Sequence, residues 1–183
     1  MKTLVTYSSL TGNTQKVAQA ISQAIPDSDI FPINECPDLT DYSLLLVGFW
    51  VDRGHADDKA KRFLSALKEK TVGFFFTLGA YPDSPHADEV VKVTEDLLKE
   101  NGNNIIGSFR CQGKVDPALI EKMKKILPPD HPHAQMTEER KDRLTEAAKH
   151  PNEEDFNKAK AFADDTYKRA LAEVPETIKA GQS

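Results

Sequence analysis

A hydroxyl-rich stretch near the N-terminus has the composition of a loop that binds phosphate. It follows an apolar run at residues 2–7, which predicts a β-strand, and precedes a helical pattern marked by Val17, Ile21 and Ile25. A helix N-terminus offers free N–H groups and partial positive charge, so an anion is favoured at such a junction. We therefore expect the binding residues of this stretch to be Ser8, Ser9, Leu10, Thr11, Gly12, Asn13 and Thr14.

The composition of this stretch excludes two common phosphate loops. Residues 8–14 contain no Lys or Arg and a single glycine. A Walker-type loop requires a Gly-Lys pair, and a dinucleotide fingerprint requires several glycines. What remains is a phosphate held by neutral donors, with hydroxyl groups and the Asn13 amide around it and Gly12 allowing close approach of the backbone. The alternative is a helix that serine and threonine merely cap.

The six residues from Ser9 to Thr14 resemble the S/T-x-T-G-x-T signature of flavodoxins position for position. Flavodoxins hold the phosphate of FMN with neutral donors, so the resemblance implies the same arrangement here. The stretch offers one phosphate site and no glycine pattern for a pyrophosphate. FMN is therefore expected rather than FAD or a nicotinamide cofactor.

Alternating strand and helix patterns predict a doubly wound α/β fold. After the first strand, further strands are expected at residues 29–33, 42–49, 71–77 and 104–111. Helical patterns follow the first strand and recur at about residues 57–68, 85–100 and 117–127. Residues 34–41 leave no room for a full helix. The flavodoxin-like arrangement of these elements is a five-stranded parallel sheet in the order 2-1-3-4-5.

Three loops meet at the switch point of such a sheet, where ligands bind beside the carboxyl ends of the strands. They are residues 8–14, 49–56 and 77–85, and the last two each carry an aromatic side chain, Trp50 and Tyr81. In flavodoxins, aromatic rings at these places flank the isoalloxazine ring. We expect further cofactor contacts from Phe49, Trp50, Val51, Gly54, Leu78, Gly79, Ala80 and Tyr81. The alternative is that the aromatic rings pack beneath their loops.

Longer strings resemble a narrower group within this family. Residues 1–127 look like a short-chain flavodoxin, because the fifth strand lacks a long insertion. Residues 48–54, 77–84 and 111–115 are similar to the flavodoxin-like proteins that accompany bacterial bilirubin reductase. The helix start at residues 150–155 recurs in flavodoxin-like proteins with C-terminal extensions.

A proline-rich segment at residues 128–133 divides the chain. We place a flavodoxin-like FMN-binding domain at residues 1–127, and a linker with a helical extension at residues 128–183. The last helix carries an apolar stripe that must be buried, so the extension is expected to pack on the domain or on a partner. His131 and His133 are expected to be linker residues rather than a metal pair.

Composition excludes several classes of partner. The net charge is −5 with no basic cluster, which argues against nucleic-acid binding. No apolar run approaches the ~20 residues that span a bilayer, and no signal peptide is recognised, so a cytoplasmic protein without membrane contact is expected. Cys36 and Cys111 belong to opposite edges of the expected sheet, too far apart for a disulfide. No metal-ligand spacing is present.

Two functions are consistent with these residues. The favoured one is a non-enzymatic flavoprotein that passes electrons or flavin to a partner reductase, with bilirubin reductase as the candidate. The alternative is an FMN-dependent NAD(P)H oxidoreductase acting on a quinone or tetrapyrrole. No catalytic residue is assigned, and His55, His86, Cys111 and Lys114 are expected to be ordinary loop residues. A flavin-free binding module requires that Trp50 and Tyr81 face elsewhere.

Overall fold

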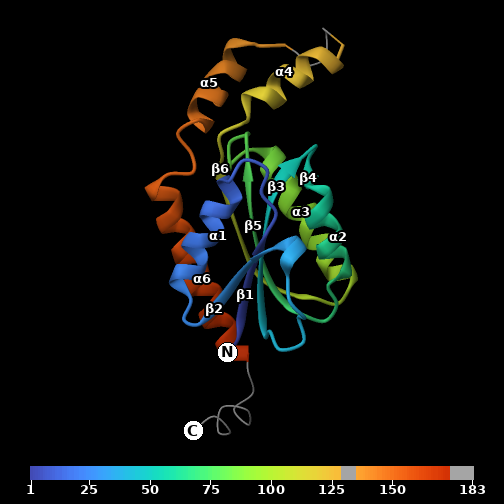
Figure 1. Cartoon of the computed structure of the whole chain (residues 1–183), viewed down its shortest axis with the longest axis vertical. Helices are drawn as coiled ribbons and strands as arrows, with labels where there is room; N and C mark the ends of the chain where they lie inside the picture. Colours follow the sequence, from blue (N-terminus) through green and yellow to red (C-terminus); the bar gives the residue numbers. More distant parts are fainter. Residues whose placement is uncertain (129–134, 174–183) are drawn as a thin grey trace, which may run out of the picture.

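A parallel sheet forms the centre of the protein (Figure 1). The computed structural model describes residues 1–128 and 135–173. The long strands run parallel in the order β2-β1-β3-β5-β6. They are β1 (Thr3–Tyr7), β2 (Ser28–Pro32), β3 (Leu44–Asp52), β5 (Thr71–Leu78) and β6 (Asn104–Gln112). Numbered along the chain without the short β4, this order is 2-1-3-4-5, and the predicted fold is confirmed.

Helices cover both faces of the sheet. One face carries α1 (Asn13–Ala24) and α6 (Glu153–Glu173), and the other carries α2 (Asp58–Ala66) and α3 (Pro85–Glu100). The polar connection after β2 holds only a 3-10 turn, η1 (Ile33–Glu35), as its length predicted. Two further helices, α4 (Pro117–Ile126) and α5 (Glu138–Ala147), lie beyond the carboxyl ends of the strands (Figure 1).

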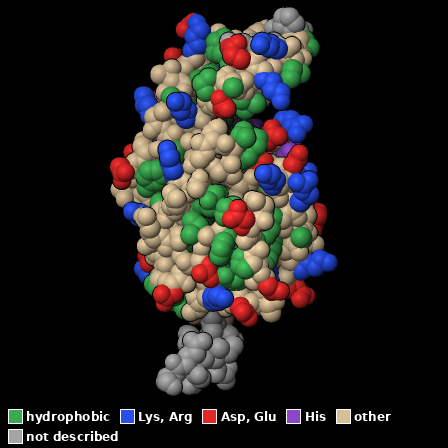
Figure 2. Space-filling model, in the orientation of Figure 1, with side chains coloured by type: hydrophobic (Ala, Val, Ile, Leu, Met, Phe, Trp, Pro, Cys, Tyr) green, Lys and Arg blue, Asp and Glu red, His purple; other side chains and the backbone are tan. Residues whose placement is uncertain are grey.

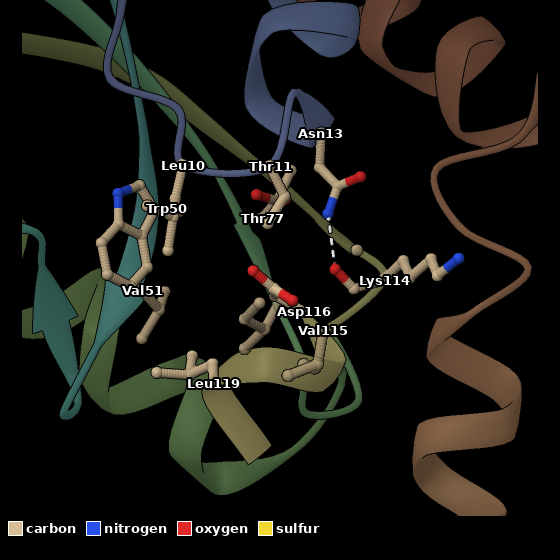
Figure 3. Close-up of a pocket in the computed structure, with 13 residues that line it drawn as sticks. Leu10, Thr11, Asn13, Trp50, Val51, Thr77, Lys114, Val115, Asp116 and Leu119 are labelled. Atoms are coloured by element: carbon tan, nitrogen blue, oxygen red, sulfur yellow. Dashed lines mark hydrogen bonds between the residues drawn. The ribbon is translucent and has the colours of Figure 1, made fainter. Parts of the chain in front are cut away.

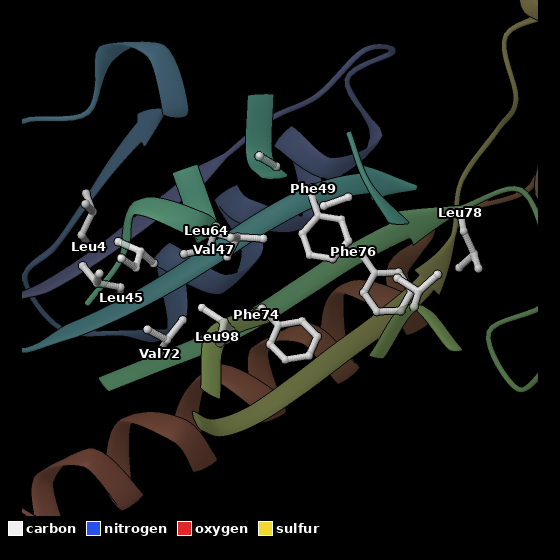
Figure 4. Packing of buried hydrophobic residues seen from close by; sticks show 14 of the residues in the cluster. Leu4, Leu45, Val47, Phe49, Leu64, Val72, Phe74, Phe76, Leu78 and Leu98 are labelled. Carbon is white, nitrogen blue, oxygen red and sulfur yellow. The ribbon is translucent and has the colours of Figure 1, made fainter. Parts of the chain in front are cut away.

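The central strands form the core because they are apolar on both sides. Residues 44–49 of β3 and 72–78 of β5 are buried throughout, as expected for parallel strands covered by two helical layers. On the side of α2 and α3, the ring of Phe49 stacks on those of Phe76 and Phe74, with centroids 5.3 Å and 6.3 Å apart (Figure 4). This rigid layer fixes where the ends of β3 and β5 lie.

The last helix belongs to the opposite core layer. Ala159, Ala163 and Ala170 of α6 are buried in one cluster with residues of α1, and the Phe162 ring stacks on Phe109 of β6 at 6.0 Å. Small side chains on α6 let it approach α1 closely. Helix α6 thus packs on α1 and β6, while the division of the chain into a domain at residues 1–127 and an extension stays a prediction. His131 and His133 lie outside the described residues.

A short hairpin replaces part of a predicted loop. Strand β3 continues to Asp52, three residues beyond the predicted end, and pairs antiparallel with β4 (His55–Ala56). The turn between them is Arg53 and Gly54, with φ of 50° and 86°. Positive φ at both central residues is the backbone of a two-residue hairpin turn, which Gly54 permits. The prediction of a single loop at residues 49–56 is therefore wrong.

The two cysteines are free, as expected. Burial raises the pKa of the Cys111 thiol far above its ordinary value, and the nearby Asp155 carboxylate adds to that effect. The pKa of Cys36 is also raised by burial. In residues 1–128 and 135–173, no group of His, Cys, Asp and Glu is arranged to hold a metal ion. Within those same ranges, none of the helices has the length and apolar character needed to cross a membrane.

One hydrogen bond at the edge of the sheet should make stability depend on alkaline pH. The Tyr42 hydroxyl donates to Asp29 Oδ2 at 2.6 Å, and this bond, followed by burial, raises the Tyr42 pKa to about 12. The phenol is favoured in its neutral form, so its stabilisation is complete below about pH 10, the ordinary tyrosine value, and is lost as the pH rises to about 12.

Tyr42→Phe should therefore lower the free energy of unfolding by about 1.5 kcal/mol near pH 8, the size of a hydrogen bond to a charged group. The difference from the unsubstituted protein should shrink between about pH 10 and about pH 12. Urea unfolding of both proteins across that range measures it. Tyr167→Phe, at a half-buried tyrosine of α6, is the matched control. A difference for Tyr42→Phe that stays constant with pH would contradict the assignment.

Candidate functional site

A pocket lies at the carboxyl edge of the sheet, where four segments converge (Figure 3). The loop between β1 and α1 forms one side, and the ends of β3 and β5 form the next. The segment after β6, with the start of α4, closes the remainder. The lining residues are Leu10, Thr11, Asn13, Trp50, Val51, Thr77, Leu78, Gly79, Gly113, Lys114, Val115, Asp116 and Leu119.

The N-terminus of α1 meets this pocket without a side-chain cap. Gly12 is the N-cap residue at φ 84°, and no side chain hydrogen-bonds the first turn of the helix. The Ser9 hydroxyl instead accepts the Gly12 N–H at 3.1 Å, within the loop. Each of the other described α-helices is capped by a side chain, namely Asp57, Ser84, Asp116, Thr137 and Asn152. The first-turn N–H groups of α1 are thus the ones left for an external acceptor.

Two of the expected hydroxyl ligands are committed to the scaffold. The Ser8 hydroxyl donates to Asp57 Oδ1 at 2.8 Å, which joins the start of the loop to the N-terminus of α2. The Thr14 and Thr77 hydroxyls lie 2.9 Å apart, and both side chains are buried. These two contacts hold the loop against β5 and α2. Thr11 and Asn13 are the loop residues whose polar side chains line the pocket.

The two expected aromatic walls differ in position. Trp50 lines the pocket, whereas Tyr81 is 40% exposed and is not among the lining residues. The Tyr81 backbone carbonyl accepts from Ser84 at the start of α3, so its loop serves that helix. Val115 and Leu119, from the segment after β6, lie across the pocket from Trp50 and Leu10 (Figure 3). The structure therefore brings one of the two expected aromatic rings, Trp50, to the pocket, together with the aliphatic side chains of Val115 and Leu119.

The remaining expected residues support the pocket from outside. Phe49 is fully buried in the core beneath it, Gly54 forms the hairpin turn, and Ala80 packs against the same core. Ser9 and Gly12 shape the first loop. The expected residues that do line the pocket are Leu10, Thr11, Asn13, Trp50, Val51, Leu78 and Gly79.

Sequence reasoning missed the contribution of the segment after β6. Asn13 Nδ2 donates to the Lys114 carbonyl oxygen at 2.9 Å, which draws this segment against the first turn of α1. A Cβ atom on Gly113 would lie 2.8 Å from Asn13 Nδ2, so the two chains touch closely at a glycine. The available signal was topological: the carboxyl end of β6 lies at the same edge as those of β1, β3 and β5. Thr77 was missed because it falls inside a strand.

The pocket presents neutral donors rather than basic side chains. Among the lining residues that the structure describes, Lys114 is the basic one, and its ammonium group points away from the pocket (Figure 3). The Asp116 carboxylate points inward and accepts the Ala118 N–H at 2.8 Å. Arg53 is largely exposed and does not line the pocket. Its Nη2 atom lies 3.3 Å from Asp52 Oδ2. Basic and acidic side chains are interspersed over the face shown in Figure 2.

Comparison with known proteins agrees with this geometry. The flavodoxin domain family model matches residues 4–164. The chain is 35% identical over 170 residues to the flavodoxin-like domain-containing protein BilS of Clostridioides difficile (strain CD3), which covers 89% of this chain and 94% of that protein. The chain belongs to the flavodoxin family.

Solved structures share the flavodoxin fold. A flavodoxin from the domain Archaea matches with a TM-score of 0.59 at 16% identity, over 93% of this chain and 99% of that one. A flavoprotein from Lactobacillus acidophilus NCFM, solved in complex with FMN, matches with a TM-score of 0.50 at 22% identity, over 66% of this chain and 97% of that one. These two matches support the fold, and the family model and the BilS relative confirm the family predicted from the sequence.

The buried pair of hydroxyls should act as a structural unit. Thr14→Val or Thr77→Val leaves one buried hydroxyl without its partner, and each should lower the free energy of unfolding by about 1–2 kcal/mol. The double variant replaces both hydroxyls by methyl groups and should cost less than the sum of the two. Denaturant unfolding of the four proteins measures this cycle. Single variants as stable as the unsubstituted protein would contradict the buried pairing.

Proposed function

We propose that this flavodoxin binds FMN, with the phosphate at the N-terminus of α1 and the isoalloxazine ring toward Trp50. The observation that carries the proposal is the uncapped first turn of α1, which opens into the pocket beside Thr11 and Asn13. Free N–H groups and the helix dipole suit a phosphate dianion. The complex of the Lactobacillus flavoprotein with FMN supports the same choice of ligand.

The lining residues divide into two groups that match the two ends of FMN. Thr11 and Asn13 offer a hydroxyl and an amide beside the helix N-terminus, where a phosphate requires donors. Trp50, Val51 and Leu119 offer an indole face and aliphatic groups, where a flavin ring requires apolar surface and exclusion of water. FMN supplies one- and two-electron redox chemistry when bound.

The proposed role is electron transfer or flavin supply to a partner reductase. The identity to the BilS protein and the resemblance to proteins that accompany bilirubin reductase support bilirubin reductase as that partner. The pocket lining supports a carrier because its inward-facing titratable group, Asp116, is engaged in capping α4. Cys111 is buried with a raised pKa, so its thiol is unsuited to covalent chemistry.

Ligand titration tests the binding part of the proposal. The apo-protein should bind FMN more tightly than riboflavin, and FAD no more tightly than FMN, because the site holds one phosphate. Thr11→Val should weaken FMN binding by about tenfold or more, the loss of one charge-assisted hydrogen bond, and leave riboflavin binding unchanged. Thr145→Val, at an exposed threonine of α5, is the matched control. Equal affinity for FMN and riboflavin would refute the phosphate site.

Turnover measurements test the role. With NAD(P)H and a quinone or tetrapyrrole, the isolated FMN-loaded protein should work well below the ~1–10³ s⁻¹ of ordinary enzymes. Rapid reduction of the quinone or tetrapyrrole should require addition of a reductase. Bilirubin reductase is the first to test. Turnover by the isolated protein at ordinary enzyme rates would replace the carrier by an oxidoreductase.

A further inference from the structure

We propose that Asp155 and His150, which lie outside the pocket, position its phosphate end through a chain of hydrogen bonds that reaches Asn13. The proposal rests on the proposed FMN site. It assigns a function to the helix start at residues 150–155, which the site itself does not use. Asp155 and His150 would be positioning residues, since neither lines the pocket.

The chain makes a long excursion between the sheet and its last helix. After β6 it runs outward through α4 and α5 and returns at residue 150 to enter α6, which lies beside α1 (Figure 1). The two ends of this excursion are fastened to each other, because the Lys114 N–H donates to the His150 carbonyl oxygen at 3.0 Å. We call this contact the neck.

Asp155 fixes the His150 side of the neck. Asp155 Oδ2 accepts the Asn152 N–H at 2.9 Å and contacts His150 Nδ1 at 2.5 Å. In return, Asn152 Oδ1 accepts the N–H groups of Glu154 and Asp155 at 3.0 Å and 3.2 Å. This is a reciprocal capping box at the start of α6, and the Asp155 side chain is buried. The His150 ring is thereby anchored to the first turn of a helix that belongs to the core.

The Lys114 side of the neck leads directly into the pocket. The Lys114 carbonyl oxygen accepts from Asn13 Nδ2, and Gly113 packs on the same side chain. Val115 and Asp116 follow immediately and line the pocket, as does Leu119 one turn later. The segment at residues 113–116 is therefore held by His150 on one side and contacts Asn13 on the other. It also leads into the aliphatic wall of the pocket, which is formed by Val115 and Leu119. If the neck opens, this segment is no longer held against the N-terminus of α1.

Ligand binding by neck variants tests the proposal. His150→Phe removes the ring contact with Asp155 and keeps the backbone carbonyl, and Asp155→Ala removes both side-chain contacts. Each should weaken FMN binding by about tenfold and riboflavin binding by a clearly smaller factor, because FMN loses contacts at the phosphate end and at the aliphatic wall, whereas riboflavin loses those at the wall alone. Asp164→Ala, at an exposed residue of the same helix, should bind both ligands normally.

A double variant separates positioning from general destabilisation. Asn13→Ala breaks the last link of the chain, so Asn13→Ala combined with His150→Phe should weaken FMN binding little more than Asn13→Ala alone. If the loss of FMN affinity in the double variant equals the product of the two single-variant losses, the two residues act independently and the proposal is overturned. Equal weakening of FMN and riboflavin by His150→Phe would overturn it too, since that is the signature of a purely structural role.

Amide hydrogen exchange gives a readout that needs no ligand. In His150→Phe and Asp155→Ala, exchange of the Lys114 amide, which donates to the His150 carbonyl oxygen, should accelerate by about tenfold or more, while β3 and β5 keep their protection. Unchanged exchange of the Lys114 amide would overturn the neck contact itself. If the unsubstituted protein binds FMN and riboflavin equally, the proposed function fails, and hydrogen exchange still decides whether Asp155 and His150 hold this segment.

Discussion

The position of the α1 N-terminus is the constraint on which the site depends. A helix start can present its N–H groups to a ligand only if other contacts fix the helix and no side chain occupies the groups. Here the fixing contacts are the buried Thr14–Thr77 pair and the Ser8–Asp57 hydrogen bond. They tie the loop to β5 and to α2. The hydroxyl groups of Ser8 and Thr14, which the sequence suggested as ligands, therefore hold the start of α1 in place, and its N–H groups stay available to a ligand.

The pocket wall shows how the excursion after β6 shapes the site. The sequence suggested two aromatic walls, and the structure has Trp50 on one side with Val115 and Leu119 facing the interior from another. Tyr81 does not line the pocket, and its backbone carbonyl accepts from Ser84 at the start of α3. The start of α4 thereby takes part in the pocket, and the neck between Lys114 and His150 becomes relevant to binding.

The strands of the sheet and the loop before α1 could be predicted from the sequence because both depend on local signals. Apolar runs mark β3 and β5, and the stretch from Ser9 to Thr14 combines a motif with a helix start. The direction of a hydroxyl is set by tertiary neighbours, so the pairing of Thr14 with Thr77 was beyond reach. The same holds for the segment 113–119, whose fold depends on where α6 returns. The hairpin at Arg53 and Gly54 was missed because a two-residue turn leaves a weak signal.

The central claim is that the first turn of α1 binds the phosphate of FMN. The most direct test is the ¹H–¹⁵N spectrum of the labelled protein during addition of FMN, with riboflavin as the comparison. The account predicts that the backbone amide signals of Asn13, Thr14 and Gln15 move strongly downfield with FMN and little with riboflavin, because a phosphate accepts hydrogen bonds from them. Binding of FMN that leaves these three signals as unmoved as riboflavin does would contradict it.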